Sequence, residues 1–228
     1  MKISPRIVEV RQAVLKKNDL LALELRRTFA DSGVYVVSLV SSPGSGKTTL
    51  LRETMRQLRG QHRIAALVGD LATEHDAQRL RETGAPVRQI TTGSVCHLDA
   101  EMVRSALAGW DLAALDFLFI ENVGNLVCPA AFDLGEDLRA VLLSVTEGED
   151  KPLKYPTIFN TADLAVITKI DLSGAADYDQ GLFHRYLEQV RPGLDVFHVS
   201  AKYGHGVQCW LRRLEAGLSR KRTAAAPV

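Results

Sequence analysis

The sequence predicts an α/β fold in which a mostly parallel sheet of about seven strands carries helices on both faces. Short runs rich in apolar and β-branched residues alternate with longer segments whose apolar residues recur at helical spacing. The short runs are too uniformly apolar for a sheet with one face in water, so both faces must be covered. In addition, 228 residues with 46% hydrophobic content can bury one large core. We therefore expect one three-layer α/β/α domain.

The composition argues against several classes of protein. Lys and Arg together number 28, and Asp and Glu number 27, so the net charge does not favour binding to nucleic acid or to an anionic membrane. The three cysteines form no C-x-x-C pair, and their odd number argues against a disulfide framework. No apolar stretch approaches the roughly 18 residues of a membrane span, and the first five residues do not begin a signal peptide. We expect a cytoplasmic protein that binds neither nucleic acid nor membrane.

Residues 1–33 are expected to form an N-terminal helical segment that packs on the core. Ser4-Pro5 suits the N-cap and first turn of a helix, and apolar residues follow at helical spacing to about Ala30. Asn18-Asp19 predicts a break and a second helix start, because such side chains often cap helices. We expect this segment to lie outside the sheet and to carry no chemistry.

Strands and helices alternate over residues 34–218, which we expect to form the main domain. Strands are expected at 36–40, 63–69, 87–90, 113–120, 138–145, 164–170 and 194–199. Helices are expected after residue 46 and over 73–80, 99–108, 156–162, 178–190 and 207–218. Residues 219–228, which include Arg220-Lys221-Arg222, are expected to form a flexible basic tail. Ligands of such a sheet bind at the carboxyl ends of its strands.

A phosphate-binding loop follows the first expected strand, with the sequence Ser41-Ser42-Pro43-Gly44-Ser45-Gly46-Lys47-Thr48-Thr49. The order of strand, Gly-rich turn, Gly-Lys-Thr and helix is typical of P-loop NTPases. The glycines let backbone N–H groups turn toward phosphate oxygens, Lys47 can reach the β- and γ-phosphates, and the Thr48 hydroxyl suits Mg²⁺. Ser41 stands where the pattern usually begins with glycine, a position that a small residue can fill. The expected nucleotide contacts in this loop are Gly44, Ser45, Gly46, Lys47, Thr48 and Thr49.

Two carboxylates are expected beside this loop. Asp70 follows the second strand and Glu121 ends the fourth, whereas Asp116 lies roughly 16 Å from Glu121, toward the opposite end of the sheet. Glu121-Asn122-Val123-Gly124 occupies the place where phosphate-loop GTPases carry Asp-x-x-Gly, so its carboxylate can hold Mg²⁺ and the Gly124 N–H can sense the γ-phosphate. The alternative for Glu121 is a strand-end residue that faces solvent. The catalytic candidates are Lys47, Asp70, Glu121 and Gly124, and the Mg²⁺ candidates are Thr48, Asp70 and Glu121.

A guanine-recognition motif is expected at the end of the sixth strand. Lys169-Ile170-Asp171 has the Lys-x-Asp pattern in which the carboxylate accepts two N–H bonds from guanine and the lysine stem covers the ring. Thr168 replaces the usual Asn, which predicts weaker bracing of the loop. Ser200-Ala201-Lys202, after the last strand, matches the element that contacts the base from the other side. Together these residues favour GTP over ATP.

Cys96, His97 and Cys128 are candidates for a metal site. Two thiolates and an imidazole suit Zn²⁺ or Ni²⁺, and both segments follow strand ends near the phosphate loop. The spacing matches no standard zinc finger, and adjacent residues in an extended chain point in opposite directions. One metal would need a bent loop or ligands pooled from two subunits. The alternative is two buried cysteines and a loop histidine without metal, and we expect Cys209, in the last helix, to lie in the core.

Five segments give the chain a family resemblance: Ser42-Pro43-Gly44-Ser45-Gly46-Lys47-Thr48-Thr49, Gly69-Asp70-Leu71-Ala72-Thr73-Glu74-His75-Asp76-Ala77, Cys96-His97-Leu98-Asp99, Glu121-Asn122-Val123-Gly124-Asn125-Leu126-Val127-Cys128-Pro129 and Thr146-Glu147-Gly148-Glu149-Asp150-Lys151-Pro152-Leu153-Lys154-Tyr155-Pro156. From about residue 34 to residue 206, the chain resembles the HypB family, the hydrogenase nickel-incorporation GTPases. The related urease accessory GTPases resemble it in the loop but typically have Cys-Pro-His where this chain has Cys96-His97.

The resemblance implies a Mg²⁺-dependent GTPase of low turnover that assists nickel insertion into [NiFe]-hydrogenase. It implies a homodimer in the GTP-bound state, with nickel or zinc held at the dimer interface by Cys96, His97 and Cys128. It also implies two partners, a nickel-delivery protein and the hydrogenase large-subunit precursor. Residues 1–30 contain neither Cys nor His, so we expect no N-terminal metal store. The alternatives are an accessory protein for another nickel enzyme, such as urease, or a plain P-loop ATPase or kinase with structural cysteines.

Overall fold

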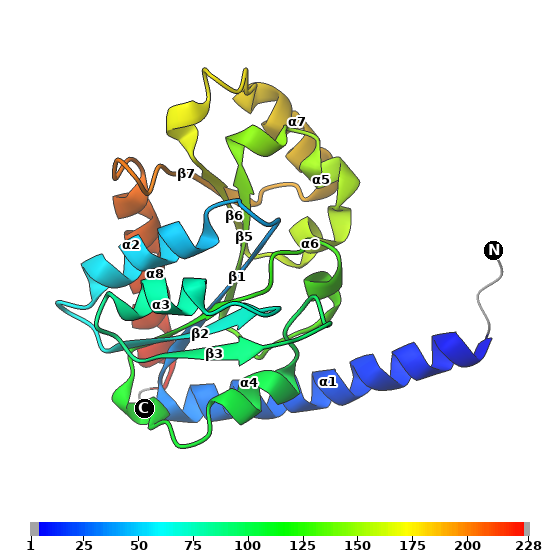
Figure 1. The fold of residues 1–228 in the computed structure, drawn as a ribbon, viewed down its shortest axis with the longest axis vertical. Helices are drawn as coiled ribbons and strands as arrows, with labels where there is room; N and C mark the ends of the chain where they lie inside the picture. Colours follow the sequence, from blue (N-terminus) through cyan, green and yellow to red (C-terminus); the bar gives the residue numbers. More distant parts are fainter. Residues whose placement is uncertain (1–4, 226–228) are drawn as a thin grey trace.

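A parallel sheet forms the centre of the molecule in the computed structural model, which describes residues 5–225 (Figure 1). Within this range, seven strands are hydrogen-bonded in the order β3-β2-β4-β1-β5-β6-β7. The strands are β1 (Tyr35–Ser41), β2 (Ile64–Asp70), β3 (Val87–Thr91), β4 (Phe117–Glu121), β5 (Leu138–Ser144), β6 (Leu164–Thr168) and β7 (Asp195–His198). The predicted fold class and the number of strands are confirmed.

Helices connect these strands. The α-helices are α1 (Pro5–Ser32), α2 (Lys47–Leu58), α3 (His75–Arg81), α4 (Ala100–Ala106), α5 (Lys151–Lys154), α6 (Pro156–Thr161), α7 (Gln180–Val190) and α8 (Val207–Ala225). Single 3-10 turns are η1 (Leu112–Ala114), η2 (Cys128–Ala131), η3 (Val145–Glu147) and η4 (Ile170–Leu172). Among the helices of residues 5–225, none combines the length and the hydropathy of a membrane-spanning segment.

The central strand β1 sets the edge on which ligands can bind. It pairs in parallel with β4 on one side and with β5 on the other, and Leu39 lies opposite Glu121. Because all pairs are parallel, the carboxyl ends of β1, β2 and β4 meet at one edge. Asp116 lies at the opposite end, where its carbonyl oxygen accepts a bond from the Tyr35 N–H.

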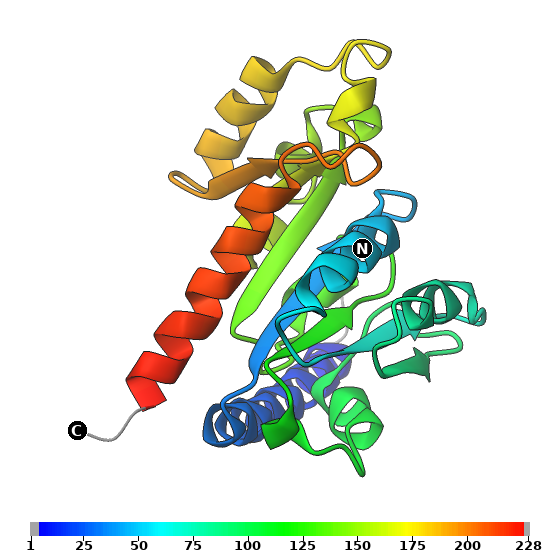
Figure 2. The same ribbon diagram turned by 90° about the vertical axis from the view of Figure 1, so that its left-hand side faces the viewer.

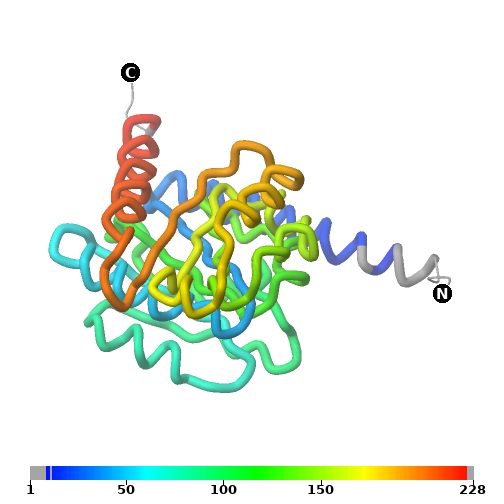
Figure 3. Tube along the Cα trace, turned by 90° about the horizontal axis from the view of Figure 1, so that it is seen from above, coloured from blue at the N-terminus to red at the C-terminus, as the bar shows by residue number. Residues whose placement is uncertain are grey.

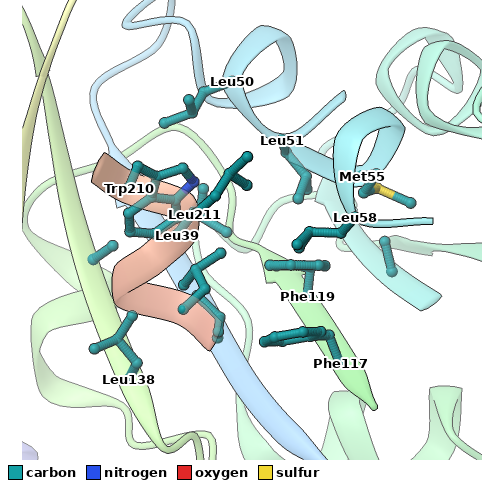
Figure 4. Packing of buried hydrophobic residues seen from close by; sticks show 14 of the residues in the cluster. Leu39, Leu50, Leu51, Met55, Leu58, Phe117, Phe119, Leu138, Trp210 and Leu211 are labelled. Carbon is teal, nitrogen blue, oxygen red and sulfur yellow. The ribbon is translucent and has the colours of Figure 1, made fainter. Parts of the chain in front are cut away.

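Helices α2, α3 and α8 cover one face of the sheet. Figure 4 shows apolar side chains of α2 and α8 packed over Phe117 and Phe119 of β4. The indole of the fully buried Trp210 donates to Thr54 Oγ1 at 2.9 Å, which joins α8 to α2 across the core. Figure 2 shows α8 running along the flank of the sheet. This packing holds α2, the helix that follows the phosphate-binding loop, against the sheet.

The other face is covered by two groups of helices. Apolar residues of α1 and α4 pack on β1, β2 and β4, with Phe29 fully buried. Helices α6 and α7 pack on β5 and β6 through a second cluster that contains Phe159 and Phe183. The result is the predicted three-layer arrangement, with helices on both faces of the sheet.

The predicted break at Asn18-Asp19 is wrong, because α1 is one continuous helix from Pro5 to Ser32. Asn18 is buried, and its side chain bonds to the Asp133 carbonyl and to the Ala100 N–H at the start of α4 instead of capping a new helix. An asparagine whose polar atoms are satisfied elsewhere does not compete for the helix backbone. The amino-terminal part of α1 extends beyond the body of the protein (Figures 1 and 3).

The C-terminal region also differs from expectation, since α8 continues through most of the predicted flexible tail to Ala225. Lys221 Nζ bonds to Asp137 Oδ2 at 2.6 Å and to the Val34 carbonyl at 2.7 Å, and Arg222 pairs with Asp116. These ion pairs anchor the basic residues to the amino-terminal edge of the sheet. Residues 226–228 lie outside the described chain.

Two smaller expectations need correction. The fourth strand begins at Phe117 and not at residue 113, because Asp111 caps a 3-10 turn over Leu112–Ala114. Cys209 is exposed, not part of the core, and its Sγ accepts a bond from Arg212. Its place on α8 therefore faces solvent rather than the sheet.

Candidate functional site

The phosphate-binding loop joins β1 to α2 as predicted. Gly44 and Gly46 have positive φ values of 73° and 94°, and α2 begins at Lys47. Lys47 is 7% exposed, and its Nζ donates to Ser41 Oγ at 2.8 Å. The Ser45 hydroxyl also bonds to Ser41. Ser41 therefore does more than fill the place of a glycine, because its hydroxyl holds the lysine of the loop.

Two opposite charges are buried beside this loop. Burial lowers the pKa of Lys47, although Glu121 opposes this effect. Burial also raises the pKa of Glu121 to about 7, while Lys47 and the bond from Thr48 act in the opposite direction. A buried cation and a buried carboxylate at one strand edge suit a ligand that brings both phosphates and a metal ion.

The residues predicted to hold Mg²⁺ have a donor set that fits this ion. Thr48 Oγ1 donates to Glu121 Oε1 at 2.6 Å, and the buried Glu121 Oε2 has no hydrogen-bond partner in the described chain. Asp70 Oδ1 accepts bonds from the N–H groups of Ala72 and Thr73, both at 2.9 Å. All candidate ligand atoms are oxygens, which Mg²⁺ prefers. The alternative of a solvent-facing Glu121 is excluded, because this side chain is 2% exposed.

A pocket of about 460 Å³ opens above the loop. Its lining includes most of the predicted residues of this edge, namely Gly44, Gly46, Lys47, Thr48, Thr49, Asp70, Glu121, Gly124 and Lys169. A Cβ on Gly124 would come within 3.0 Å of Pro43 Cα, so only glycine lets this segment approach the loop so closely. The predicted catalytic and phosphate-binding residues therefore share one cavity.

Asp76 and Arg79 also line this pocket and were not predicted as site residues. Arg79 Nη2 donates to Thr49 Oγ1 at 3.2 Å, and Arg79 Nη1 lies 3.5 Å from Asp76 Oδ1. The sequence did contain a signal for these two residues: Asp76 and Arg79 lie one turn apart on the helix that follows the strand ending at Asp70. It was not specific enough to single out the arginine.

The base-recognition residues lie at the neighbouring strand ends. Lys169 has a positive φ of 56°, and its Nζ donates to the Gly44 carbonyl at 2.7 Å. Thr168 Oγ1 donates to the Ser45 carbonyl at 2.5 Å, so the threonine braces the loop despite replacing asparagine. Asp171 is exposed in η4.

Ser200, Ala201 and Lys202 follow β7 beside this segment, and the Ile170 N–H bonds to the Val199 carbonyl at 3.3 Å. Asp171, Ser200, Ala201 and Lys202 lie outside the lining of the phosphate pocket. A base bound by them would extend beyond that pocket along the sheet edge, toward β6 and β7.

The three candidate metal ligands come together within one chain. One ligand atom each from Cys96, His97 and Cys128 lies within 4.8 Å of the others. The two Sγ atoms are 2.9 Å apart, and neither cysteine forms a disulfide bond. His97 Nδ1 is buried without a hydrogen-bond partner in the described chain, and the ring stacks on Phe132 at 3.9 Å. The loop is bent, so adjacent ligands can serve one ion, and the soft donor set fits Ni²⁺ or Zn²⁺.

Two asparagines tie this cluster to the phosphate pocket. Asn122 Oδ1 accepts from the Leu98 N–H at 3.0 Å, and Asn125 Nδ2 donates to the Cys96 carbonyl at 3.3 Å. Both asparagines lie on the segment that runs from Glu121 to Cys128, so this segment contacts both sites. The sequence had shown the two asparagines only as part of a motif, because their partners lie in another loop.

The family model for the CobW/HypB/UreG nucleotide-binding domain matches residues 35–198. The hydrogenase maturation factor HypB of Azotobacter vinelandii is 50% identical over 210 residues, which cover 92% of this chain and 69% of the relative. The hydrogenase/urease maturation factor HypB of Helicobacter pylori is 42% identical over 88% of this chain and 84% of its own length.

Solved structures agree with these matches. HypB from Helicobacter pylori in complex with nickel superposes with a TM-score of 0.83 at 38% identity, over 93% of this chain and 98% of that one. The signal recognition particle 54 kDa protein from Aeropyrum pernix, at 18% identity and a TM-score of 0.55 over 84% of this chain and 50% of that one, shares the fold alone.

Proposed function

Since this chain belongs to the HypB hydrogenase maturation factors of the CobW/HypB/UreG family, we propose that it is a GTP-hydrolysing metallochaperone that delivers nickel during [NiFe]-hydrogenase maturation. The observation that carries this proposal is that one segment, from Glu121 to Cys128, contributes to both the phosphate pocket and the cysteine and histidine cluster. It begins with a buried carboxylate in the phosphate pocket and ends with a thiol of the Cys96, His97 and Cys128 cluster.

GTP hydrolysis requires mainly positioning and neutralisation of charge. Lys47 leaves the Ser41 hydroxyl and contacts the β- and γ-phosphates, while backbone N–H groups of the loop hold the phosphate oxygens. Thr48, Asp70 and Glu121 would hold Mg²⁺, which neutralises developing phosphate charge when bound. Asp70 is the best-placed residue to orient the attacking water. Asp171 selects guanine, with Lys169 and the Ser200-Ala201-Lys202 segment around the base.

Nickel is the cargo, bound by Cys96, His97 and Cys128 at the interface of a GTP-dependent homodimer. GTP closes the segments 70–76 and 121–128 and favours this dimer, and hydrolysis loosens both the interface and the metal site. A nickel-delivery protein would load the site, and the precursor of the hydrogenase large subunit would receive the metal. The name of the Helicobacter pylori relative includes urease, so a second nickel enzyme is an alternative client.

The test is to measure bound Ni²⁺ per chain and the oligomeric state in the presence of GDP and of a non-hydrolysable GTP analogue. We expect the analogue to raise the dimer fraction and to change the Ni²⁺ affinity. Equal Ni²⁺ stoichiometry, equal affinity and equal oligomeric state in both nucleotide states would contradict the coupling. Competition between ATP and GTP for binding to the purified protein checks the base preference, and a preference for ATP would contradict the role of Asp171.

A further inference from the structure

Asn18 connects helix α1 to the two loops that carry the cysteine and histidine cluster. Its side chain is 5% exposed and makes two long-range bonds. Asn18 Oδ1 accepts from the Ala100 N–H at 2.9 Å, three residues after His97. Asn18 Nδ2 donates to the Asp133 carbonyl at 2.9 Å, five residues after Cys128. One buried amide therefore spans the two segments whose separation sets the distance between the thiols.

The surroundings of Asn18 hold both loops closely against α1. Asp133 forms a bidentate pair with Arg26 of the same helix, with distances of 2.9 to 3.0 Å. A Cβ on Gly135 would lie 2.8 Å from the Ala22 carbonyl oxygen, so the loop after Cys128 lies directly on the backbone of α1. On the other side, α1 packs against α4, which Ala100 begins. Helix α1 therefore contacts the segments that follow both His97 and Cys128.

The three asparagines around the cluster hold it in different ways. Asn122 and Asn125 bond to Leu98 and Cys96 from the segment that borders the phosphate pocket. Asn18 instead bonds from a long helix on the outer face of the sheet, away from that pocket. A movement of segment 121–128 would therefore shift the contacts of Asn122 and Asn125, whereas the bond from Asn18 to Ala100 would stay with α1.

We propose that Asn18 is a positioning residue of the nickel site, through which helix α1 fixes the distance of Cys96 and His97 from Cys128. This inference rests on the proposed function, since it assumes that the cluster binds nickel. Groups that orient metal ligands without touching the ion typically change metal affinity by 10- to 100-fold when they are removed. Asn18 acts in this way on both ligand segments at once, although the sequence places it in a helix with no Cys or His.

The test compares Asn18→Ala, Asn18→Asp and Gln12→Ala in the full chain, with Ni²⁺ titrated against the thiolate-to-nickel charge-transfer absorption. Gln12 is an exposed amide on the same helix and serves as the matched control. We expect the dissociation constant of Ni²⁺ to rise about 10-fold or more in Asn18→Ala. Asn18→Asp keeps an acceptor for the Ala100 N–H but faces the Asp133 carbonyl with a second oxygen, so an intermediate rise is expected. Gln12→Ala should bind Ni²⁺ like the parent.

The affinity for the GTP analogue and the melting temperature are measured on the same proteins. A loss of Ni²⁺ affinity without a change in these two quantities indicates a positioning role, whereas a loss of all three indicates general destabilisation. Parental Ni²⁺ affinity and absorption in a folded Asn18→Ala or Asn18→Asp protein would overturn the inference. A Cys128→Ala protein is titrated in parallel. If it binds Ni²⁺ like the parent, the proposed nickel site itself is wrong. If it loses Ni²⁺ while the Asn18 variants do not, only the role of Asn18 is wrong.

Discussion

The phosphate loop and the cysteine and histidine cluster follow strand ends of the same sheet, but they are assembled in different ways. The loop is a run of consecutive residues between β1 and α2, and Lys47 is held by Ser41, six positions earlier. The cluster joins Cys96 to Cys128, which are 32 positions apart. Its backbone is held by side chains from Asn18, Asn122 and Asn125.

This difference separates a site that local structure builds from one that tertiary contacts build. The loop needs a strand, a turn with glycines and a helix start, all of which nearby residues supply. The cluster needs two segments to be held at a fixed separation, which requires side-chain contacts from segment 121–128 itself and from helix α1. We therefore expect changes in the loop to affect nucleotide chemistry alone and changes around the cluster to affect metal binding alone, except along segment 121–128.

The largest expected effect tests the nucleotide side of this comparison. Lys47→Ala should lower GTP turnover roughly 100- to 1,000-fold, because it removes a charge-assisted contact to the phosphates. Ni²⁺ affinity without nucleotide should stay unchanged. Phosphate release measured under single-turnover conditions gives the rate, with the exposed Lys16→Ala as control. Near-normal turnover would contradict the assignment of the phosphate loop.

Base choice should respond to Asp171→Asn. The substitution replaces an acceptor oxygen by a donor, which opposes the guanine N–H groups and suits xanthine, whose C2 carries an oxygen. We expect GTP affinity to fall roughly 100-fold and XTP affinity to rise. Competition binding measures both values, with the exposed Asp195→Asn as control. A retained preference for GTP would place the base elsewhere on the protein.

Coupling between the two sites should depend on Cys128, four residues beyond Gly124. Binding free energies are reciprocal, and typical couplings of about 1–3 kcal/mol correspond to a shift of roughly 5- to 150-fold in Ni²⁺ affinity between GDP and a GTP analogue. Cys128→Ala and Cys96→Ala should abolish this shift and leave GTP affinity nearly unchanged. Cys209→Ala, which alters an exposed cysteine on α8, is the control. Identical Ni²⁺ affinities of the parent in both nucleotide states would show that the two sites are independent.

The smallest effect is expected at the opposite end of the sheet, on stability alone. Burial acts to raise the pKa of Asp116, but bonds from Arg63 and Arg222 outweigh it and lower this pKa to about 2. Its ionised form therefore stabilises the fold fully above the unfolded pKa of about 4, and this contribution is lost as the pH falls through about 2. Asp116→Asn should cost about 2 kcal/mol of unfolding free energy at pH 7.

Urea denaturation of the parent and of Asp116→Asn at pH 7 and pH 3 measures this contribution. The difference between the two proteins should narrow at pH 3, because Asp116 of the unfolded parent, with a pKa of about 4, is then mostly protonated, whereas Asp116 of the folded parent stays mostly ionised. GTP turnover and Ni²⁺ affinity at pH 7 should match those of the parent. A change in GTP turnover or in Ni²⁺ affinity of the folded Asp116→Asn protein would show that the two ends of the sheet are not independent.

The sequence alone was enough to determine the fold class and the parts of the site that depend on local pattern. Alternation of apolar runs with helical periodicity predicted the parallel sheet, and the strand before Gly44 and the helix after Gly46 predicted the phosphate loop. The positions of Asp70 and Glu121 followed from the rule that parallel strands share a carboxyl edge. Each of these inferences depends on residues close together in the chain or on a general property of sheets.

Only the tertiary structure decided the features that depend on distant partners. The sequence predicts a helix break at Asn18, but in the structure Ala100 and Asp133 bond to its amide and the helix continues. The sequence likewise predicts a flexible basic tail, but Asp137 and Asp116 pair with its Lys221 and Arg222. The meeting of the Cys96 and Cys128 side chains likewise depends on how two loops bend. Such contacts follow from the packing of the whole chain, because many weak interactions between remote segments fix the position of each polar group.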